Sequence, residues 1–232
     1  LVPRLRSPEG RLAGTLTLAG TPEQPRFDGE LGLRKGSVQI PRAGIALREM
    51  QLAARADASG VLRLDGGARS GDGRVHLAGE LQTNEAWPWP LRLTLKGEHF
   101  QVFDRPDARV QVNPDLALTL TGNEFHLSGD LKVPEARLRP RELPNRAVSV
   151  SRDAQLVHSD APPATPFRLA IDVGLTLGKS VRFQGFGLDA RFAGQVRYRD
   201  LIDQVPRMTG QLNITEGRYR AYGQHLRIER GN

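Results

Sequence analysis

The chain has 232 residues, a formal net charge of +7 and no cysteine. The lack of cysteine excludes disulfides, thiolate metal sites and thiol nucleophiles, and it fits an extracytoplasmic compartment. Hydrophobic residues make up 38% and aromatic residues 6% of the chain, below the usual apolar share of about 45–50%. With 25 glycines and 16 prolines, this composition favours a long open sheet over a compact core. No apolar run approaches the roughly 20 residues of a membrane-spanning helix, so we expect any anchor or signal peptide outside this chain.

Alternation of apolar and polar residues with period 2 dominates the chain and predicts strands. In chain order the alternating stretches are Leu12 to Leu18, Val75 to Leu81, Leu91 to Leu95, Leu116 to Leu120, Phe125 to Val133, and Phe167 to Leu175. Turn signals separate many of them at roughly the 8–12-residue spacing of all-β chains. The clearest are Ser59-Gly60, Gly66-Gly67, Gly71-Asp72-Gly73 and Gly122-Asn123.

Residues 43–58 are ambiguous between helix and strand. They contain strong helix formers, and Leu47 and Met50 could begin a helical stripe. Ile45 and Leu47 alternate, however, and the alternation can resume at Gln51 after a bulge. We therefore favour a strand, with a short helix as the alternative.

A weak internal repeat has the form small-x-apolar-x-apolar-x-x-small-x-apolar. It begins at Gly29, Gly129 and Gly210, and its second small residue is Gly36, Ala136 or Gly217. We interpret each copy as a strand, a small-residue turn and a second strand. The irregular spacing excludes a strict solenoid and favours one hairpin unit used several times.

Three loops interrupt the strand pattern, at residues 84–90, 139–146 and 160–166. The last is the only candidate domain boundary, but the strand pattern resumes unchanged after it, so we expect residues 1–232 to form one continuous unit. The first loop contains Trp87 and Trp89 in the sequence WPWP. We expect both rings to pack on a sheet end, the alternatives being a polyproline-type ligand and a membrane-interface anchor.

The arginines are scattered among apolar residues, as on the solvent face of strands, and form no basic tract. Tyr198, Tyr219 and Tyr222 do not form an obvious base-stacking platform, so we expect no nucleic acid partner. The five histidines show no metal-ligand spacing, and His126 is expected to face solvent. Ser151, Asp153, His158 and Asp160 are triad residue types without a nucleophile elbow. We therefore expect no enzyme, no metal and no cofactor.

Many half-apolar strands with few helices to cover them must bury one face elsewhere. A barrel, a sandwich, or a trough that holds a ligand would each satisfy this requirement, and the alternation does not select among them. About 14 strands at roughly 4.8 Å spacing would make a trough on the order of 65 Å long, enough to hold acyl chains.

Several segments resemble the C-terminal conserved region of the TamB family. The most specific is Gly217–Ile228 (GRYRAYGQHLRI), whose GxYxAYGQxLxI form resembles the family signature. Residues 181–194 (VRFQGFGLDARFAG) are similar to the family's VxFxGFGLDAxLxG. ARSGDG at 68–73, NPDL at 113–116 and VPEA at 133–136 match in order. The resemblance spans roughly residues 30 to 232, and the family's final barrel-proximal stretch is missing, so we expect an excised fragment.

The resemblance implies a periplasmic part of a long protein that is anchored in the inner membrane of a Gram-negative bacterium. It implies an elongated, U-shaped β-groove, all-β with little helix and an apolar interior. The implied partner is a TamA-like outer-membrane insertase barrel. Two roles are implied: carrying phospholipid between the membranes, or assembling autotransporters and nascent outer-membrane proteins. The family brings no catalytic residues.

The sustained one-face alternation favours the lipid role, with phospholipid acyl chains as the ligand. The expected lining of the groove consists of the apolar residues that share one strand face: Leu91, Leu93, Leu95, Leu116, Leu118, Leu120, Phe125, Leu127, Leu131, Phe167, Leu169, Ile171, Val173, Leu175, Val181, Phe183, Leu212, Ile214, Tyr219, Leu226 and Ile228.

Overall fold

The computed structural model describes residues 6–21, 25–57, 59–85, 87–140, 167–221 and 224–228. These residues form strands, turns and bends without a helix, as the all-β prediction requires. The described part contains 13 strands, against the roughly 14 expected. They are β1 (Arg6–Gly20), β2 (Pro25–Ile40), β3 (Ile45–Ala56), β4 (Val61–Ser70), β5 (Gly73–Gln82), β6 (Leu91–Glu98), β7 (Phe100–Arg105), β8 (Ala108–Thr121), β9 (Glu124–Leu138), β10 (Arg168–Gly185), β11 (Leu188–Asp200), β12 (Arg207–Ala221) and β13 (Gln224–Ile228).

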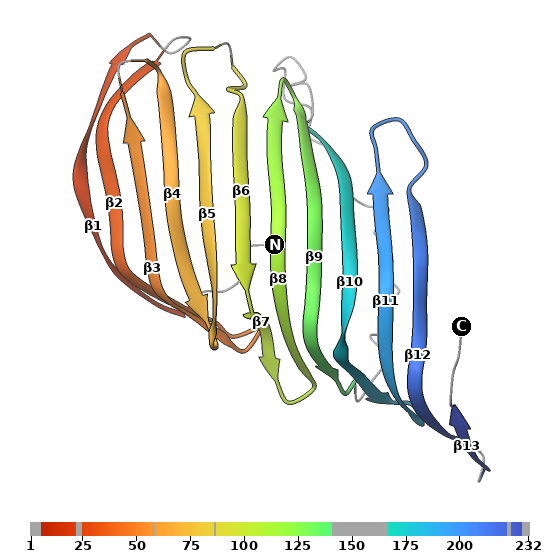
Figure 1. Ribbon diagram of the computed structural model, residues 1–232. Helices are drawn as coiled ribbons and strands as arrows, with labels where there is room; N and C mark the ends of the chain where they lie inside the picture. The colour runs from red at the N-terminus through yellow and green to blue at the C-terminus, as the bar shows by residue number, and fades with distance from the viewer. Residues whose placement is uncertain are drawn as a thin grey trace, which may run out of the picture.

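All 13 strands belong to one sheet, in which chain order is also spatial order except that β7 lies off the path and pairs with β8. Figure 1 shows a single curved layer running from β1 to β13, with no second layer over either face among the described strands. Within the described residues, β1 pairs only with β2 and β13 only with β12, so the sheet is open at both edges. Of the three predicted closures, the chain therefore adopts the curled open sheet rather than a barrel or a sandwich.

One neighbouring pair is parallel. β9 and β10 pair in parallel from Arg168 opposite Glu124 to Phe183 opposite Leu138, whereas the other neighbouring strands are antiparallel. A parallel pair needs a crossover of a dozen or more residues, and residues 139–167 provide the connection here. The hairpin interpretation of the sequence did not predict this pairing. The predicted loop at 160–166, and most of the one at 139–146, lie outside the described residues.

β7 lies against the ends of the β2–β3 and β4–β5 hairpins. β6 and β7 share β8 as their partner, and the strand breaks between them at His99, whose φ is +49°. The Asp104 amide donates to the Ala43 carbonyl in the β2–β3 turn at 2.9 Å. The fully buried Ser70 donates its hydroxyl to the Gln101 carbonyl at 2.7 Å. These bonds tie the ends of the β2–β3 and β4–β5 hairpins to the centre of the sheet.

The internal repeat is a bulged strand, and its interpretation as a hairpin is wrong. Each copy lies within one long strand, β2, β9 or β12. In each copy, two residues separate the second apolar residue from the second small residue. A register shift occurs at this point, as between Leu33 and Gly36 of β2 and next to Ile214 of β12. A bulge inserts an extra residue and bends the strand. The spacing therefore keeps the apolar positions before and after the bulge on the same face.

The bulges lie at one level of the sheet, and the strands bend there. Register shifts occur at this level in most strand pairs, among them β2–β3, β8–β9, β10–β11 and β11–β12. The most buried apolar cluster sits at the bend: Val112, Val133, Ala136 and Val181, with Phe100, Val102, Val110, Leu131, Leu175, Leu177 and Phe192 packed against them. Since residues from both sides of the bend meet in this cluster, the sheet bends toward its apolar face. The result is a trough whose axis runs across the strands.

The other local predictions have mixed outcomes. Residues 45–56 form β3, with a register shift between Arg48 and Gln51, as the bulged-strand interpretation of 43–58 predicts. Turns are found at Ser59-Gly60, at Gly71-Asp72 and at Gly122-Asn123. The predicted turn at Gly66-Gly67 is wrong. Gly66 lies inside β4, opposite Leu52 and Leu77, where a Cβ would crowd the Gln51 carbonyl oxygen at 2.6 Å.

Candidate functional site: an apolar groove

Cross-strand register brings the alternating apolar residues onto one continuous face. Paired residues of neighbouring strands project from the same side of a sheet. One row runs from Leu91 of β6 through Leu120 of β8 and Phe125 of β9 to Leu169 of β10. The next row toward the bend contains Leu93, Leu118, Leu127 and Ile171. We call this side the apolar face and the other side the polar face.

Of the 21 predicted lining residues, 19 are joined by these pairings to the apolar face, and for Ile228 the structure describes the backbone pairing alone. Beyond the two rows just given, the pairs are Leu95 with Leu116, Leu131 with Leu175, Val173 with Tyr198, Val181 with Phe192, Phe183 with Ala190, Leu212 with Gly194, Ile214 with Phe192, Tyr219 with Leu226, and Ile228 with Gly217. Phe167 precedes β10, and its ring centroid lies 5.5 Å from that of Phe125. The structure therefore brings the predicted set together on one surface.

Further apolar residues lie on the same face and were absent from the predicted lining. Some belong to an alternating stretch that the sequence already shows, such as Leu77 and Leu81 of β5. Others flank a two-residue break in alternation, which we interpreted as a turn and which marks a bulge. Among the additional residues are Leu31, Leu33, Leu52, Ala54, Leu62, Leu64, Leu77, Leu81, Val110, Val112, Leu177, Phe192 and Val196.

Burial across the apolar face is uneven. Leu120 and Val181 are 8% and 6% exposed, whereas Leu169 and Leu226 are 52% and 56% exposed. The buried positions lie in the central strands and at the bend, and the exposed ones lie near a strand end or a sheet edge. The face is thus an open trough that still presents apolar surface to solvent.

Among the described residues that have a cross-strand partner, charged ones join the apolar face only at strand ends. Asp200, the last residue of β11, lies opposite Ile171 and accepts a hydrogen bond from the Tyr198 hydroxyl at 3.3 Å. Desolvation, and then the charge of Asp200, raises the pKa of the Tyr198 phenol. Arg105 ends β7 opposite Ala108 and pairs with Asp107 at 3.0 Å. The paired positions in the middle of the trough therefore present only uncharged side chains.

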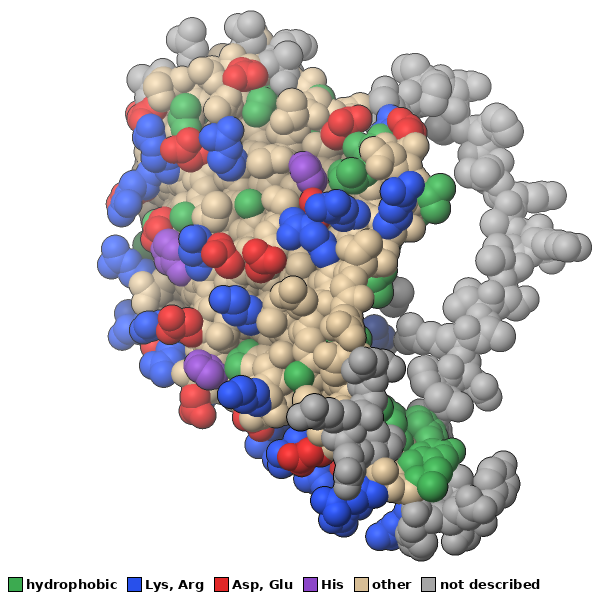
Figure 2. All heavy atoms as spheres, turned by 45° about the vertical axis from the view of Figure 1, so that its right-hand side comes forward, with side chains coloured by type: hydrophobic (Ala, Val, Ile, Leu, Met, Phe, Trp, Pro, Cys, Tyr) green, Lys and Arg blue, Asp and Glu red, His purple; other side chains and the backbone are tan. Residues whose placement is uncertain are grey.

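The polar face is held by cross-strand ion pairs. Figure 2 shows a face on which Lys and Arg are intermixed with Asp and Glu and hydrophobic side chains are sparse. Arg197 and Arg199 of β11 both contact Asp172 of β10, and the Arg197 hydrogen bond is the main cause of the lowered pKa of Asp172. These side chains are partly exposed, so solvent screening limits what the pairs add to stability. His126 lies on this face and is exposed, as predicted.

A row of four arginines crosses the polar face near the bend. Arg109, Arg137, Arg182 and Arg191 lie directly opposite one another on β8, β9, β10 and β11. Like charges in this arrangement destabilise a sheet. Three of the four pair with a carboxylate, namely Asp104 at 2.9 Å, Asp189 at 2.6 Å and Glu216 at 3.3 Å. The row is therefore largely neutralised within the chain.

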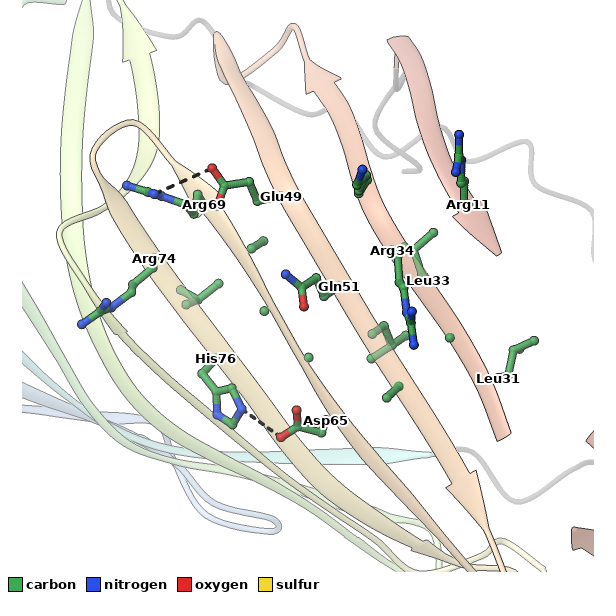
Figure 3. A pocket seen from close by; sticks show the side chains of 18 of the residues that line it. Arg11, Leu31, Leu33, Arg34, Glu49, Gln51, Asp65, Arg69, Arg74 and His76 are labelled. Carbon is green, nitrogen blue, oxygen red and sulfur yellow. Dashed lines mark hydrogen bonds and ion pairs between the residues drawn. The ribbon is translucent and has the colours of Figure 1, made fainter. Parts of the chain in front are cut away.

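A hollow of about 1140 Å³ lies on the polar face, over β1 to β5. Figure 3 shows its charged lining, including the Arg69–Glu49 pair at 3.7 Å and the His76–Asp65 pair at 2.9 Å. Basic and acidic side chains are mixed there, and much of their charge is already paired. This hollow lacks the clustered carboxylates of a cation site, and its lining mixes charged side chains with apolar ones such as Leu31 and Leu33. We therefore identify the apolar face as the candidate functional site.

Within the described residues, no group of three His, Asp or Glu side chains could hold a metal ion. The triad residue types Ser151, Asp153, His158 and Asp160 lie outside the described part of the chain. A search of the described residues finds no helix with the length and hydropathy to cross a membrane.

Comparisons with known proteins identify the family of the chain. The sequence profile of the TamB C-terminal domain matches residues 64–232. The translocation and assembly module subunit TamB of Haemophilus influenzae is 23% identical to this chain over 238 aligned residues. The alignment covers 97% of this chain and 18% of the relative. No solved structure matches the chain.

Proposed function

Because the chain belongs to the TamB family, we propose that it is a periplasmic segment of a bridge between the inner and outer membranes. In this proposal its apolar groove shields acyl chains and carries phospholipid toward the outer membrane. The chain spans 18% of the TamB relative. The inner-membrane anchor and a TamA-like partner in the outer membrane are therefore proposed for the whole protein.

One observation carries the proposal: a single apolar face continues across the sheet without a charged residue at the paired positions in its middle. The twelve strands that follow one another in the sheet span about 50 Å at roughly 4.8 Å spacing. Each methylene buried against such a surface contributes about 0.8 kcal/mol. A trough of this length and chemistry suits acyl chains better than a polar or charged ligand.

Photo-crosslinking tests the ligand directly. Probes replacing Ile171 and Val173 on the apolar face should capture phospholipid in cells. A probe at Thr176 serves as the control, because it lies on the polar face of the same strand and is exposed. Only protein adducts at Ile171 and Val173, or equal lipid capture at Thr176, would contradict the conduit.

A charge placed in the middle of the trough tests transport. Leu118→Arg inserts a guanidinium between Leu93 and Leu127, with β9 and β10 separating it from Asp200 of β11. Ile171 is a poorer site for the same change, because Asp200 lies directly opposite and could neutralise the arginine. We expect Leu118→Arg to abolish phospholipid transport in a strain that depends on this protein.

The matched control is the neighbouring residue, which projects from the other face. Ala117 lies between Thr94 and Ser128 on the polar face, so Ala117→Arg places the same charge in solvent. Transport should remain near wild type in that variant. Normal transport with Leu118→Arg in a folded protein would count against the proposal.

The open sheet edges support a second function, a scaffold for outer-membrane protein assembly. β1 has a partner on one side only among the described residues, and its Leu12 and Leu18 are 68% and 66% exposed. An exposed edge can accept an added strand by β-augmentation. The test is binding of an unfolded barrel strand to the purified chain. Binding that is equally strong with and without lipid, and that is lost when Thr15 is replaced by proline, would favour this function.

A further inference from the structure

An aromatic cluster stands at one end of the apolar face. The ring centroids of Trp87 and Trp89, in the β5–β6 loop, lie 5.2 Å apart, and those of Trp89 and Phe27 lie 5.9 Å apart, both edge to face. Phe27 belongs to β2, and three strands separate it from β6 in the sheet. The rings can meet only because the sheet curls and the loop leans inward over the trough.

Two sets of hydrogen bonds hold this loop in place. Thr83 is 1% exposed, and both its amide and its hydroxyl donate to the Gly60 carbonyl in the β3–β4 turn, at 2.8 and 3.0 Å. The Gln82 amide donates to the Pro90 carbonyl at 2.9 Å, which extends the β5–β6 pairing beyond Leu81. The loop is therefore anchored on both sides of the tryptophans.

The same pairing places the cluster on the apolar side. Leu81 lies opposite Leu91 on the apolar face, and the Trp89 ring, just before Leu91 in the chain, contacts the ring of Phe27. Phe27 lies opposite Leu18 on the same face. The rings thus stand at the rim of the trough, next to the row formed by Leu62, Leu81 and Leu91.

One polar atom in this cluster lacks a partner. The Trp89 Nε1 atom is buried and makes no hydrogen bond to any described residue. A buried unpaired N–H group costs free energy, and indole side chains usually combine apolar contact with a hydrogen bond at their polar end. Trp89 is therefore suited to a ligand that joins an apolar part to an acceptor oxygen.

We propose that this cluster binds the glycerol-ester region of a phospholipid, with the Trp89 ring turning so that its N–H, which neighbouring groups cover in this structure, donates to an ester carbonyl oxygen. The acyl chains then extend from the cluster over the leucine row toward the bend, and the headgroup lies at the rim outside the trough. This inference rests on the proposed lipid-carrying function. It adds the position and orientation of the lipid within the trough.

The composition of the chain makes the cluster directly observable, because Trp87 and Trp89 are its only tryptophans. The purified 232-residue chain is titrated with phospholipid brominated either near the ester carbonyls or near the methyl ends of its acyl chains. Bromine quenches tryptophan only at short range. We expect the bromines near the carbonyls to quench tryptophan fluorescence clearly more strongly than those near the methyl ends. The same difference is expected in a Trp87→Phe chain, in which the fluorescence comes from Trp89 alone.

A second measurement isolates the hydrogen bond. Trp89→Phe keeps an apolar ring and removes the N–H donor, and loss of one hydrogen bond should weaken phospholipid binding about two- to tenfold. Phe186→Leu is the control, because Phe186 lies in the β10–β11 turn away from the cluster. Unchanged affinity in Trp89→Phe would overturn the assigned hydrogen bond.

The outcomes separate this inference from the function on which it rests. If probes at Ile171 capture lipid but neither brominated lipid quenches the tryptophans, the conduit stands and the cluster is not a binding site. Equal quenching by both lipids would overturn the proposed orientation. If no lipid is captured and none quenches, the conduit itself fails.

Discussion

Arg182 of β10 and Asp189 of β11 form a two-point ion pair on the polar face. The Nε atom of Arg182 donates to Oδ1 of Asp189 at 2.7 Å, and Nη2 donates to Oδ2 at 2.6 Å. The pair lies next to the β10–β11 turn and at the bend of the sheet. There it offsets the repulsion between Arg182 and the neighbouring arginines of the row. Its geometry is the fork-to-fork arrangement that makes arginine–carboxylate pairs specific.

This pair predicts a pH dependence of stability. The hydrogen bond from Arg182 lowers the pKa of Asp189 from 3.8 to about 2. A lowered folded-state pKa stabilises the fold above the unfolded value, and that contribution is lost as pH falls from about 4 to about 2. Since both side chains are partly exposed, the contribution is at most about 1 kcal/mol.

Asp189→Asn should therefore lower the midpoint of urea unfolding at neutral pH. It should also reduce the fall of that midpoint as the pH drops from about 4 to about 2. Asp72→Asn, in the β4–β5 turn, is the control and should keep the wild-type profile. Identical pH profiles for Asp189→Asn and the wild type would refute the role of this pair.

Gly129 of β9 is expected to be intolerant of a side chain. Its φ is +125°, and a Cβ would overlap the Asp115 carbonyl oxygen of β8. Gly129→Ala should cost about 1–3 kcal/mol of unfolding free energy, measured by chemical denaturation. Gly32→Ala is the matched control, because a Cβ there meets its nearest atom at 3.6 Å. Equal stability of the two variants would show that the Gly129 backbone imposes no constraint.

The bulge in β12 predicts different outcomes for two one-residue deletions. Thr215 is the extra residue between Ile214, opposite Phe192, and Glu216, opposite Arg191. Deleting Thr215 removes the bulge and leaves Ile214 on the apolar face. Deleting Asn213 instead shifts Ile214 to the polar face, because side chains alternate along a strand.

We expect the Asn213 deletion to destabilise the chain by about 1 kcal/mol or more beyond the Thr215 deletion, from the lost apolar burial. Urea denaturation of both proteins measures the difference. The prediction fails if the Asn213 deletion is the more stable of the two.

Thr83 should control the position of the tryptophans. Thr83→Val keeps the side-chain shape and removes the hydroxyl that donates to Gly60, at a cost of about 0.5–1.5 kcal/mol. A loosened loop should shift tryptophan emission to longer wavelength. Thr121→Val, at an exposed strand end, should leave the emission unchanged, and an unshifted spectrum in Thr83→Val would show that this bond does not position the loop.

Strand identity could be predicted well from the sequence, because alternation is a local property. Leu91, Leu93 and Leu95 share a face in any extended chain, whichever strands lie beside them. The ambiguous segment around Leu47 was assigned correctly for the same reason, since helical periodicity was not sustained. The errors occurred where one sequence signal has two structural meanings. Gly66-Gly67 has turn composition but lies where a neighbouring backbone approaches closely.

The repeats at Gly29, Gly129 and Gly210 show the same limit. A break in alternation marks either a turn or a bulge, and the choice depends on whether a partner strand continues past it. That partner comes from a distant part of the chain, so local composition cannot decide. The aromatic cluster is a similar case, because Phe27 and Trp89 are far apart in the sequence and meet only through the curl of the sheet.

By itself, then, the sequence determined which residues are apolar on each strand and, through the Gly217–Ile228 signature, the family. Only the tertiary structure decided that β9 and β10 pair in parallel, that the bulges align, and that the sheet bends toward its apolar face. The physical reason is that alternation follows from the geometry of one extended strand. Pairing direction and curvature depend instead on hydrogen bonds and packing between strands that are remote along the chain.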